Sequence, residues 1–224
     1  MITRALILDT ETTGLSPETC QTIEVAVALY DIPHAAVIAS FASLIKNDSN
    51  EAEHVNRIPV SLLEGAMTGA VVWPSVTNLA ARADVIIAHR AEFDRGFVIQ
   101  RLREMKPWCC SKFDIEWPQG QIGDHLVHLA LAHDVPVYTA HRAMADVDTL
   151  VRTFQAASRM GADVALMIER AMRPKSKFVA LVSYEDKDKA KSNGFAWNPA
   201  AKAWERLMPE EDTKKLPFKV KKVA

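Results

Sequence analysis

The chain has 224 residues, with 49% hydrophobic and 25% charged side chains and a formal net charge of -1 at pH 7. This composition excludes a disordered or fibrous protein and is typical of a globular fold that buries roughly 70% of its extended surface. No apolar run reaches the roughly 18 residues of a membrane span, and the N-terminus lacks a signal-peptide cleavage site. The three cysteines form neither a disulfide framework nor a zinc motif, so we expect a protein of the reducing cytoplasm without a membrane partner.

The first predicted elements are strands. An apolar run at 5–8 has the character of a buried strand, and the alternating, β-branched segments 23–30 and 35–45 predict two more. Short connections favour an antiparallel arrangement of these three. Helical periodicity then follows, with one further strand at 85–89, and predicts helices near 73–82, 92–105, 121–133, 141–158 and 162–172. This order predicts an α/β fold, a mixed β-sheet flanked by helices.

The charge balance divides the chain near residue 173. Residues 1–172 hold 14 Lys and Arg against 21 Asp and Glu, whereas residues 173–224 hold 13 against 7. Pro174 disfavours continuation of the preceding helix. We therefore expect one domain at 1–172 and a small basic C-terminal module at 173–224. A basic module favours nucleic-acid binding, and a merely solubilising lysine-rich surface is the alternative.

The module has a predicted α+β order of its own. Segment 178–184 predicts a strand, 185–192 a charged helix, and 197–204 a strand–turn–strand. A last helix around 210–215 and a strand at 218–223 complete it. Its two tryptophans either stack on bases or fill the small core, and the sequence leaves both alternatives open: Trp197 and Trp204.

Four carboxylates occupy positions that the sequence pattern assigns to the interior. Asp9 and Glu11 share one face of an extended chain, while Asp94 and Asp146 each lie on the apolar side of a predicted helix. Isolated buried carboxylates cost several kcal/mol, and no Lys or Arg lies at a matching buried position. Divalent cations stabilise such a set best, and oxygen ligands favour Mg²⁺ or Mn²⁺.

A histidine accompanies the last of these acids. His141 stands five residues before Asp146, which on one helix would place the two side chains about 140° apart. We therefore expect His141 on the loop that enters the helix, where its imidazole reaches over a metal-bound water.

Three ordered motifs carry a resemblance to a known family. The segments 9–15 (DTETTGL), 88–94 (AHRAEFD) and 141–146 (HRAMAD) resemble the motifs of the DEDDh exonucleases of the ribonuclease H-like superfamily, over roughly residues 4–158. Arg90 departs from the pattern, because the family more often carries Asn there. Residues 108–113 resemble a segment of the exonuclease X or TREX-like branch of phage and bacteria. The module resembles one attached to some phage exonucleases and, more distantly, modules of annealing helicases.

The resemblance implies a ribonuclease H-like fold and a site. Asp9, Glu11, Asp94 and Asp146 would hold two Mg²⁺ ions, for which Mn²⁺ substitutes, and His141 would be the general base. It also implies that the loop after the first strand and one residue of the second motif contact the last nucleotides of the substrate: Thr12, Thr13, Gly14, Leu15 and Phe93.

These features predict a metal-dependent 3′→5′ exonuclease that hydrolyses DNA, at single strands or frayed 3′ ends, to nucleoside 5′-monophosphates. Two alternatives stay open: an RNA 3′-trimming exoribonuclease on the same fold, and a non-catalytic nucleic-acid-binding or polymerase-accessory subunit. A complete set of acids favours catalysis, since a pure binding protein has no use for buried carboxylates. The oligomeric state and the biological pathway do not follow from the sequence.

Overall fold

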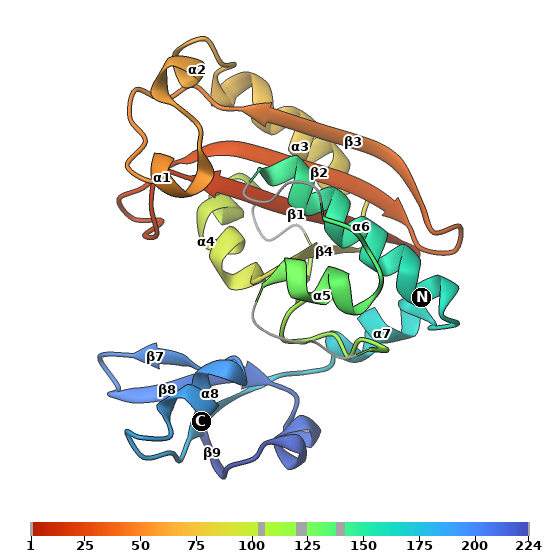
Figure 1. Cartoon of the computed structure of the whole chain (residues 1–224), viewed down its shortest axis with the longest axis vertical. Coiled ribbons are helices and arrows are strands. Elements are labelled where there is room, and N and C mark those ends of the chain that lie inside the picture. The colour runs from red at the N-terminus through yellow and green to blue at the C-terminus, as the bar shows by residue number, and fades with distance from the viewer. Residues whose placement is uncertain (1, 103–105, 120–124, 138–141, 224) are drawn as a thin grey trace. The chain divides into compact units, whose positions relative to one another are not determined.

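The computed structural model describes residues 2–102, 106–119, 125–137 and 142–223 (Figure 1). The chain folds as two compact units, Met1–Ala171 and Met172–Ala224. Over the described residues, none of the helices is both long enough and apolar enough to span a membrane.

The first unit is built on a five-stranded mixed sheet with the strand order β3-β2-β1-β4-β5. The first three strands are antiparallel, whereas β4 pairs parallel with β1, and β5 pairs parallel with β4. Their bounds are β1 Arg4–Thr12, β2 Thr22–Asp31, β3 Ala36–Leu44, β4 Val85–Ala88 and β5 Trp108–Cys110. The predicted mixed sheet is confirmed, but the sequence analysis missed β5, because three residues carry no periodicity.

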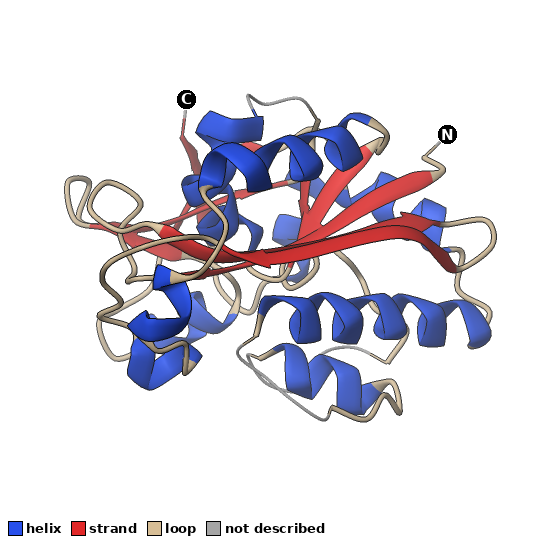
Figure 2. Cartoon of the chain, turned by 90° about the horizontal axis from the view of Figure 1, so that it is seen from above, coloured by secondary structure: helices blue, strands red, loops and turns tan. Residues whose placement is uncertain are grey.

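Helices cover both faces of this sheet, as Figure 2 shows. Helices α3 and α4 pack against the face that carries Leu6 and Leu8, and the long helix α6 lies across β1 and β2 on the other face. The short helices α1 and α2 were not predicted. The bounds are α1 Glu53–Asn56, α2 Val60–Glu64, α3 Gly69–Ala81, α4 Ala91–Leu102, α5 Leu126–Ala132, α6 Ala143–Arg159 and α7 Val164–Ala171.

The core of the first unit explains the apolar runs in the sequence. Residues 5–8 of β1, 23–30 of β2 and 85–88 of β4 are buried along their whole length, because helices lie on both sides of the central strands. Sheet geometry places Leu6 and Leu8 on one face and Ile7 on the other. The side chains that continue the Ile7 row therefore project from the sheet face on which α6 lies.

The second unit is a four-stranded antiparallel sheet with the order β7-β8-β6-β9. Its core gathers Phe178, Phe195 and Met208 around Ala190 of the helix α8. The elements are β6 Ser176–Ala180, α8 Lys187–Ser192, β7 Ala196–Asn198, β8 Ala203–Met208, a 3₁₀ helix at Glu210–Lys215 and β9 Val220–Val223.

Two expectations for the second unit need correction. The strand expected at 178–184 ends at Ala180, since the chain then turns into α8 and the Asp186 amide donates to the Ser183 carbonyl at 3.2 Å. The last helix is a 3₁₀ helix. It follows Pro209, and the Thr213 hydroxyl donates to the Glu210 carbonyl three residues earlier, at 2.7 Å.

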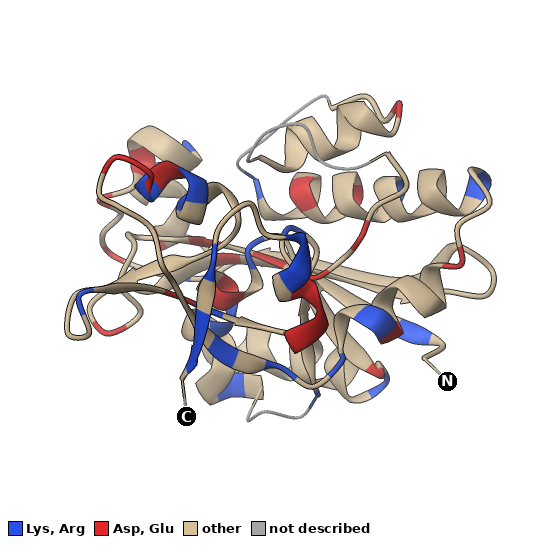
Figure 3. Cartoon of the chain, turned by 90° about the horizontal axis from the view of Figure 1, so that it is seen from below, with Lys and Arg blue, Asp and Glu red and all other residues tan. Residues whose placement is uncertain are grey.

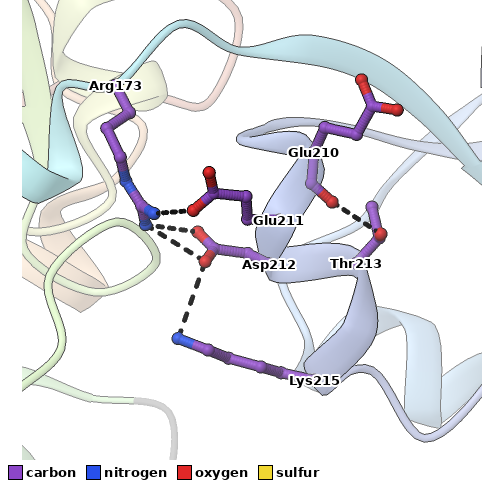
Figure 4. Close-up of polar contacts among 6 residues, drawn as sticks. All are labelled: Arg173, Glu210, Glu211, Asp212, Thr213 and Lys215. Atoms are coloured by element: carbon purple, nitrogen blue, oxygen red, sulfur yellow. Dashed lines mark hydrogen bonds and ion pairs between the residues drawn. The ribbon is translucent and has the colours of Figure 1, made fainter.

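Ion pairs connect the start of the second unit to this 3₁₀ helix, as Figure 4 shows. The Arg173 guanidinium contacts Glu211 at 2.8 Å and Asp212 at 3.1 Å, and Lys215 lies 3.6 Å from the same Asp212 carboxylate. These groups are partly exposed, so each pair contributes at most about 1 kcal/mol. Together they occupy two of the unit's acids.

Candidate active site

The first two site acids lie at the end of the central strand β1. Side chains alternate along a strand, so Asp9 and Glu11 continue the row of Ile7 on the face covered by α6. The strand extends to Thr12, which keeps both residues extended. The side chains of Asp9 and Glu11 therefore project from the same face of β1, as the sequence predicts.

Helix α6 brings a third carboxylate to the same place. Asp146 lies in the first turn of α6, and one ligand oxygen from each of Asp9, Glu11 and Asp146 lies within 4.8 Å of the others. All three residues are half-buried. Three carboxylate oxygens at this spacing form a donor set that hard divalent cations prefer.

The fourth acid comes from α4 and is held by the strand. Asp94 lies in the first turn of α4 and is only 2% exposed. Its Oδ1 accepts hydrogen bonds from the Thr10 amide at 3.0 Å and the Thr10 hydroxyl at 2.8 Å. Because Thr10 lies between Asp9 and Glu11 in the chain, these bonds attach Asp94 to the segment that carries the other acids.

The electrostatics of the cluster show why it suits a cation. Burial, followed by the charges of Asp94, Asp146, Glu11 and Glu24, raises the pKa of Asp9 well above its usual value. Burial and the neighbouring acids raise the pKa of Glu11 to about 8, and burial raises the pKa of Asp94 to about 7. The apoprotein therefore cannot keep the whole cluster ionised at neutral pH, and a bound divalent cation would offset this cost.

A fifth acid, which the sequence analysis missed, is neutralised by an arginine. Glu24 of β2 pairs with Glu11 in the sheet register and is 5% exposed. The Arg142 guanidinium donates to both Glu24 oxygens, at 3.0 and 2.9 Å, and the Ala143 amide donates to Glu24 at 3.2 Å. Glu24 thus binds the first residues of α6 and positions the helix turn that carries Asp146.

One signal in the sequence pointed to Glu24. It is a single acid inside an otherwise apolar strand, and such a group needs a partner when it is buried. Its partner lies 118 residues away, so no local spacing identifies Arg142.

Four of the expected substrate contacts lie at the last residue of β1 and in the loop that follows it. Thr12 and Thr13 are buried, and their hydroxyls bond within the loop, Thr12 to the Gly14 carbonyl at 2.6 Å and Thr13 to the Gln21 amide at 3.0 Å. A side chain at Gly14 would place its Cβ 2.6 Å from the Cys20 sulfur, so Cys20 would have to move to accept it. Leu15, by contrast, is 86% exposed and projects into solvent.

The other expected residues lie on different elements. Phe93 in the first turn of α4 is half-buried, with its ring centroid 5.0 Å from that of Phe97. His141 lies outside the described residues, and its neighbour Arg142 is the N-cap of α6.

The second motif contains a half-buried histidine beside a residue in a strained backbone conformation. His89 Nδ1 lies 3.0 Å from the Ser111 hydroxyl, and burial lowers the pKa of His89 to about 3, which keeps the imidazole neutral. Arg90 follows in the left-handed region, with φ of 70°. Asparagine adopts this conformation more readily than arginine, which gives a physical reason for the family's preference at this position.

A ribonuclease H-like mixed sheet with a carboxylate cluster at the end of its central strand defines the class as a nuclease of that superfamily. Residues 6–154 match the family described as Exonuclease, and the chain belongs to it. Residues 176–223 match a second family, described as Domain of unknown function (DUF8626). No relative was found among the curated proteins.

Several solved exonuclease structures share the fold. Exonuclease X in complex with 5′-overhanging duplex DNA is 22% identical, with a TM-score of 0.55 over 75% of this chain and 99% of that one. E. coli exonuclease I with a dT13 oligonucleotide is 17% identical, with a TM-score of 0.61 over 88% of this chain and 53% of that one. A 3′-exonuclease that recognises a histone mRNA stem-loop is 14% identical, with a TM-score of 0.57 over 72% of this chain and 65% of that one.

Proposed function

We propose that the chain is a metal-dependent 3′→5′ exonuclease of DNA that releases nucleoside 5′-monophosphates from single-stranded or frayed 3′ ends. The observation that carries this proposal is the cluster of Asp9, Glu11 and Asp146 in an exonuclease-family domain. Asp94 lies outside that cluster, bonded to Thr10, but near enough for its charge to raise the pKa of Asp9. Phosphodiester hydrolysis is the chemistry that such a set of acids supports.

The four acids would hold two divalent ions, Mg²⁺ or Mn²⁺. When bound there, the ions would supply an acidified water and a stabilised leaving oxygen. The chain's own residues provide the geometry: Thr10 orients Asp94, and Glu24 with Arg142 orients the turn of Asp146. His141, immediately before Arg142, is proposed as the general base, since an imidazole with an ordinary pKa accepts a proton near neutral pH.

The 3′ terminal nucleotide would lie along the loop after β1. In this proposal Thr12, Thr13 and Gly14 present backbone groups to the terminal sugar, while Leu15 and Phe93 pack on the last bases. The exposure of Leu15 supports its proposed contact with the last bases, because a base can pack on an apolar side chain that lies in solvent.

We propose DNA as the substrate. We also propose that the chain belongs to the exonuclease X-like or TREX-like branch found in phage and bacteria. Two of the similar structures, exonuclease X and exonuclease I, hold DNA. The 3′-exonuclease that recognises an RNA stem-loop makes RNA trimming the second candidate. Three free cysteines agree with a cytoplasmic location.

The test uses single-stranded DNA and RNA of one sequence, labelled at either the 5′ or the 3′ end, with Mg²⁺ or EDTA. We expect a descending ladder from 5′-labelled DNA, labelled mononucleotide from 3′-labelled DNA, and no product in EDTA. Asp9→Ala or Asp146→Ala should lower turnover by several orders of magnitude, and Asp148→Ala on the exposed side of α6 is the matched control. Binding without products would identify a non-catalytic subunit, and wild-type turnover in either site variant would disprove the metal assignment.

A further inference from the structure

The second unit exposes two aromatic side chains, one just before α8 and one on β7. Tyr184, just before α8, is 78% exposed, and Trp197 of β7 is 50% exposed. Trp197 pairs with Trp204 across the β7–β8 ladder, with ring centroids 5.6 Å apart. Trp204 in turn packs on the core that contains Ala190 of α8. The inner tryptophan therefore belongs to the core, and the outer one covers it while keeping half of its own surface in solvent.

Two lysines of α8 follow Tyr184 in the chain. The Lys187 ammonium lies 3.9 Å from the ring centroid of Tyr184, and Lys191 follows four residues later, on the same side of α8. The end of α8 is bound to the neighbouring strand, because the Arg206 guanidinium donates to the Asn193 carbonyl at 2.7 Å. Arg206 is in β8, two residues from Trp204. We call the set Tyr184, Lys187, Lys191 and Trp197 the α8 strip.

Most of the unit's acids are engaged in ion pairs, whereas Glu185 and Asp188 lie beside the α8 strip. Lys and Arg, blue in Figure 3, outnumber Asp and Glu by 13 to 7 in residues 173–224. Ion pairs engage five of the acids with cations outside the α8 strip: Glu205 with Lys177, Asp186 with Lys189, Glu210 with Lys222, and Glu211 and Asp212 with Arg173. The unit as a whole therefore keeps an excess of cations, and neither Lys187 nor Lys191 is among those that these ion pairs engage.

We propose that the α8 strip binds a single-stranded segment of the nucleic-acid substrate, with bases on Tyr184 and Trp197 and phosphates at Lys187 and Lys191. This inference rests on the proposed exonuclease function and adds a second contact for the strand. Unpaired bases offer the π-faces that exposed aromatic side chains bind, and the lysines of the strip match the charge of the connecting phosphates. A duplex hides its base faces and would use only the lysines.

The opposite face of the same sheet provides matched controls. Lys221 pairs with Val179 in the register, whereas the neighbouring Phe178 points into the core with α8, so Lys221 lies on the face away from α8. Lys214 lies on the 3₁₀ helix. A double change at these two lysines removes the same charge as a double change in the strip.

The experiment measures binding of the full chain to a fluorescein-labelled dT30 strand in EDTA, as a function of salt. Replacing two phosphate contacts should lower the log–log salt slope by about 1.4, so Lys187→Gln with Lys191→Gln should flatten it by that amount. Lys214→Gln with Lys221→Gln should leave the slope unchanged. Trp197→Ala should weaken binding about tenfold at constant slope, and Trp197→Phe should restore most of it.

The proposal would be overturned if both double variants lowered the salt slope equally, or if neither lowered it. Either result would mean that the strand binds to charge spread over the unit rather than to the α8 strip. Unchanged affinity in Trp197→Ala would overturn the base contact. Melting curves of every variant exclude loss of folding. Hydrolysis of a trinucleotide separates the two proposals: absence of hydrolysis in the wild type refutes the exonuclease function, whereas the EDTA binding series tests the strip on its own.

Discussion

At the scale of single residues, the second motif shows how a backbone conformation selects a side chain. Arg90 connects β4 to α4 in the left-handed region, where the Cβ of an ordinary L-residue lies too close to its own carbonyl. Asparagine tolerates this conformation because its short polar side chain bonds locally. The departure of Arg90 from the family pattern therefore carries a conformational cost.

We expect Arg90→Asn to stabilise the protein by roughly 0.5–1 kcal/mol, since it relieves part of the cost of the left-handed conformation. Urea unfolding followed by circular dichroism measures the change. Arg82→Asn is the matched control, because Arg82 is also exposed but has φ of -87°. Equal effects of the two substitutions would mean that backbone strain is not the cause.

The site acids at this scale act against the stability of the apoprotein. Glu11 has its pKa raised from 4.5 to about 8 in the folded chain. A raised folded pKa favours folding below the unfolded pKa, and this contribution is lost as the pH rises toward the folded value. The metal-free protein should therefore become less stable between pH 5 and pH 8.

Glu11→Gln should remove the part of this pH dependence that Glu11 contributes, while Asp9 and Asp94 keep theirs. In EDTA at pH 8 we expect the variant to be more stable than the wild type by at least about 1.4 kcal/mol, the equivalent of one pKa unit. At pH 5 the two should be nearly equal, and Mg²⁺ should stabilise only the wild type strongly. Thermal melts with EDTA and with Mg²⁺ measure this, with the exposed Glu92→Gln as control. A wild type whose melting temperature in EDTA rises from pH 5 to pH 8 would contradict the argument.

At the scale of elements, the site depends on how α6 meets the sheet. Three hydrogen bonds from Arg142 and Ala143 to Glu24 hold the helix start against β2. The Glu24–Arg142 ion pair also explains why five acids lie near one another although only four are proposed as metal ligands. The Arg142 guanidinium neutralises Glu24. It also lowers the pKa of Glu11, whereas the neighbouring acids raise it.

Glu24→Ala should cost about 1–2 kcal/mol of stability, a value reduced because the Arg142 side chain is 44% exposed. Its clearer effect should be on the site, because the turn that carries Asp146 loses its anchor. We expect a higher Mg²⁺ concentration for half-maximal turnover, with a smaller effect for Glu24→Gln. Asp148→Ala, which breaks the exposed Asp148–Arg152 pair of the same helix, should change neither quantity appreciably. An unaltered Mg²⁺ dependence in Glu24→Ala would show that the pair serves stability alone.

At the scale of the whole molecule, the chain combines two units with separate cores and opposite charge balance. The exonuclease-family unit holds 14 Lys and Arg against 21 Asp and Glu in residues 1–172, while residues 173–224 hold 13 against 7. An acidic domain attracts a polyanion weakly, so the basic unit would supply the long-range attraction.

A chain ending at Met172 should keep its fold, because the core clusters of the first unit contain no residue of the second. We expect nearly unchanged hydrolysis of a trinucleotide. On long strands we expect a higher KM, shorter processive runs and a flatter salt dependence of binding. Filter binding across a salt series, with full-length and shortened chains, measures the last effect. Identical salt slopes would mean that the lysines only keep the chain soluble.

The sequence by itself predicted four strands of the central sheet, and it singled out Asp9, Glu11 and Asp146, which meet at the end of the central strand β1. Apolar runs, helical periodicity and the three motifs are local patterns, and buried carboxylates in them are conspicuous because burial of a charge is costly. Only the tertiary structure decided that Glu24 pairs with Arg142, that Thr10 holds Asp94, and that β5 joins the sheet. Each of these joins segments between 20 and 120 residues apart, or is too short for a periodicity. The interactions that orient the site depend on which elements pack together, and no local spacing encodes that.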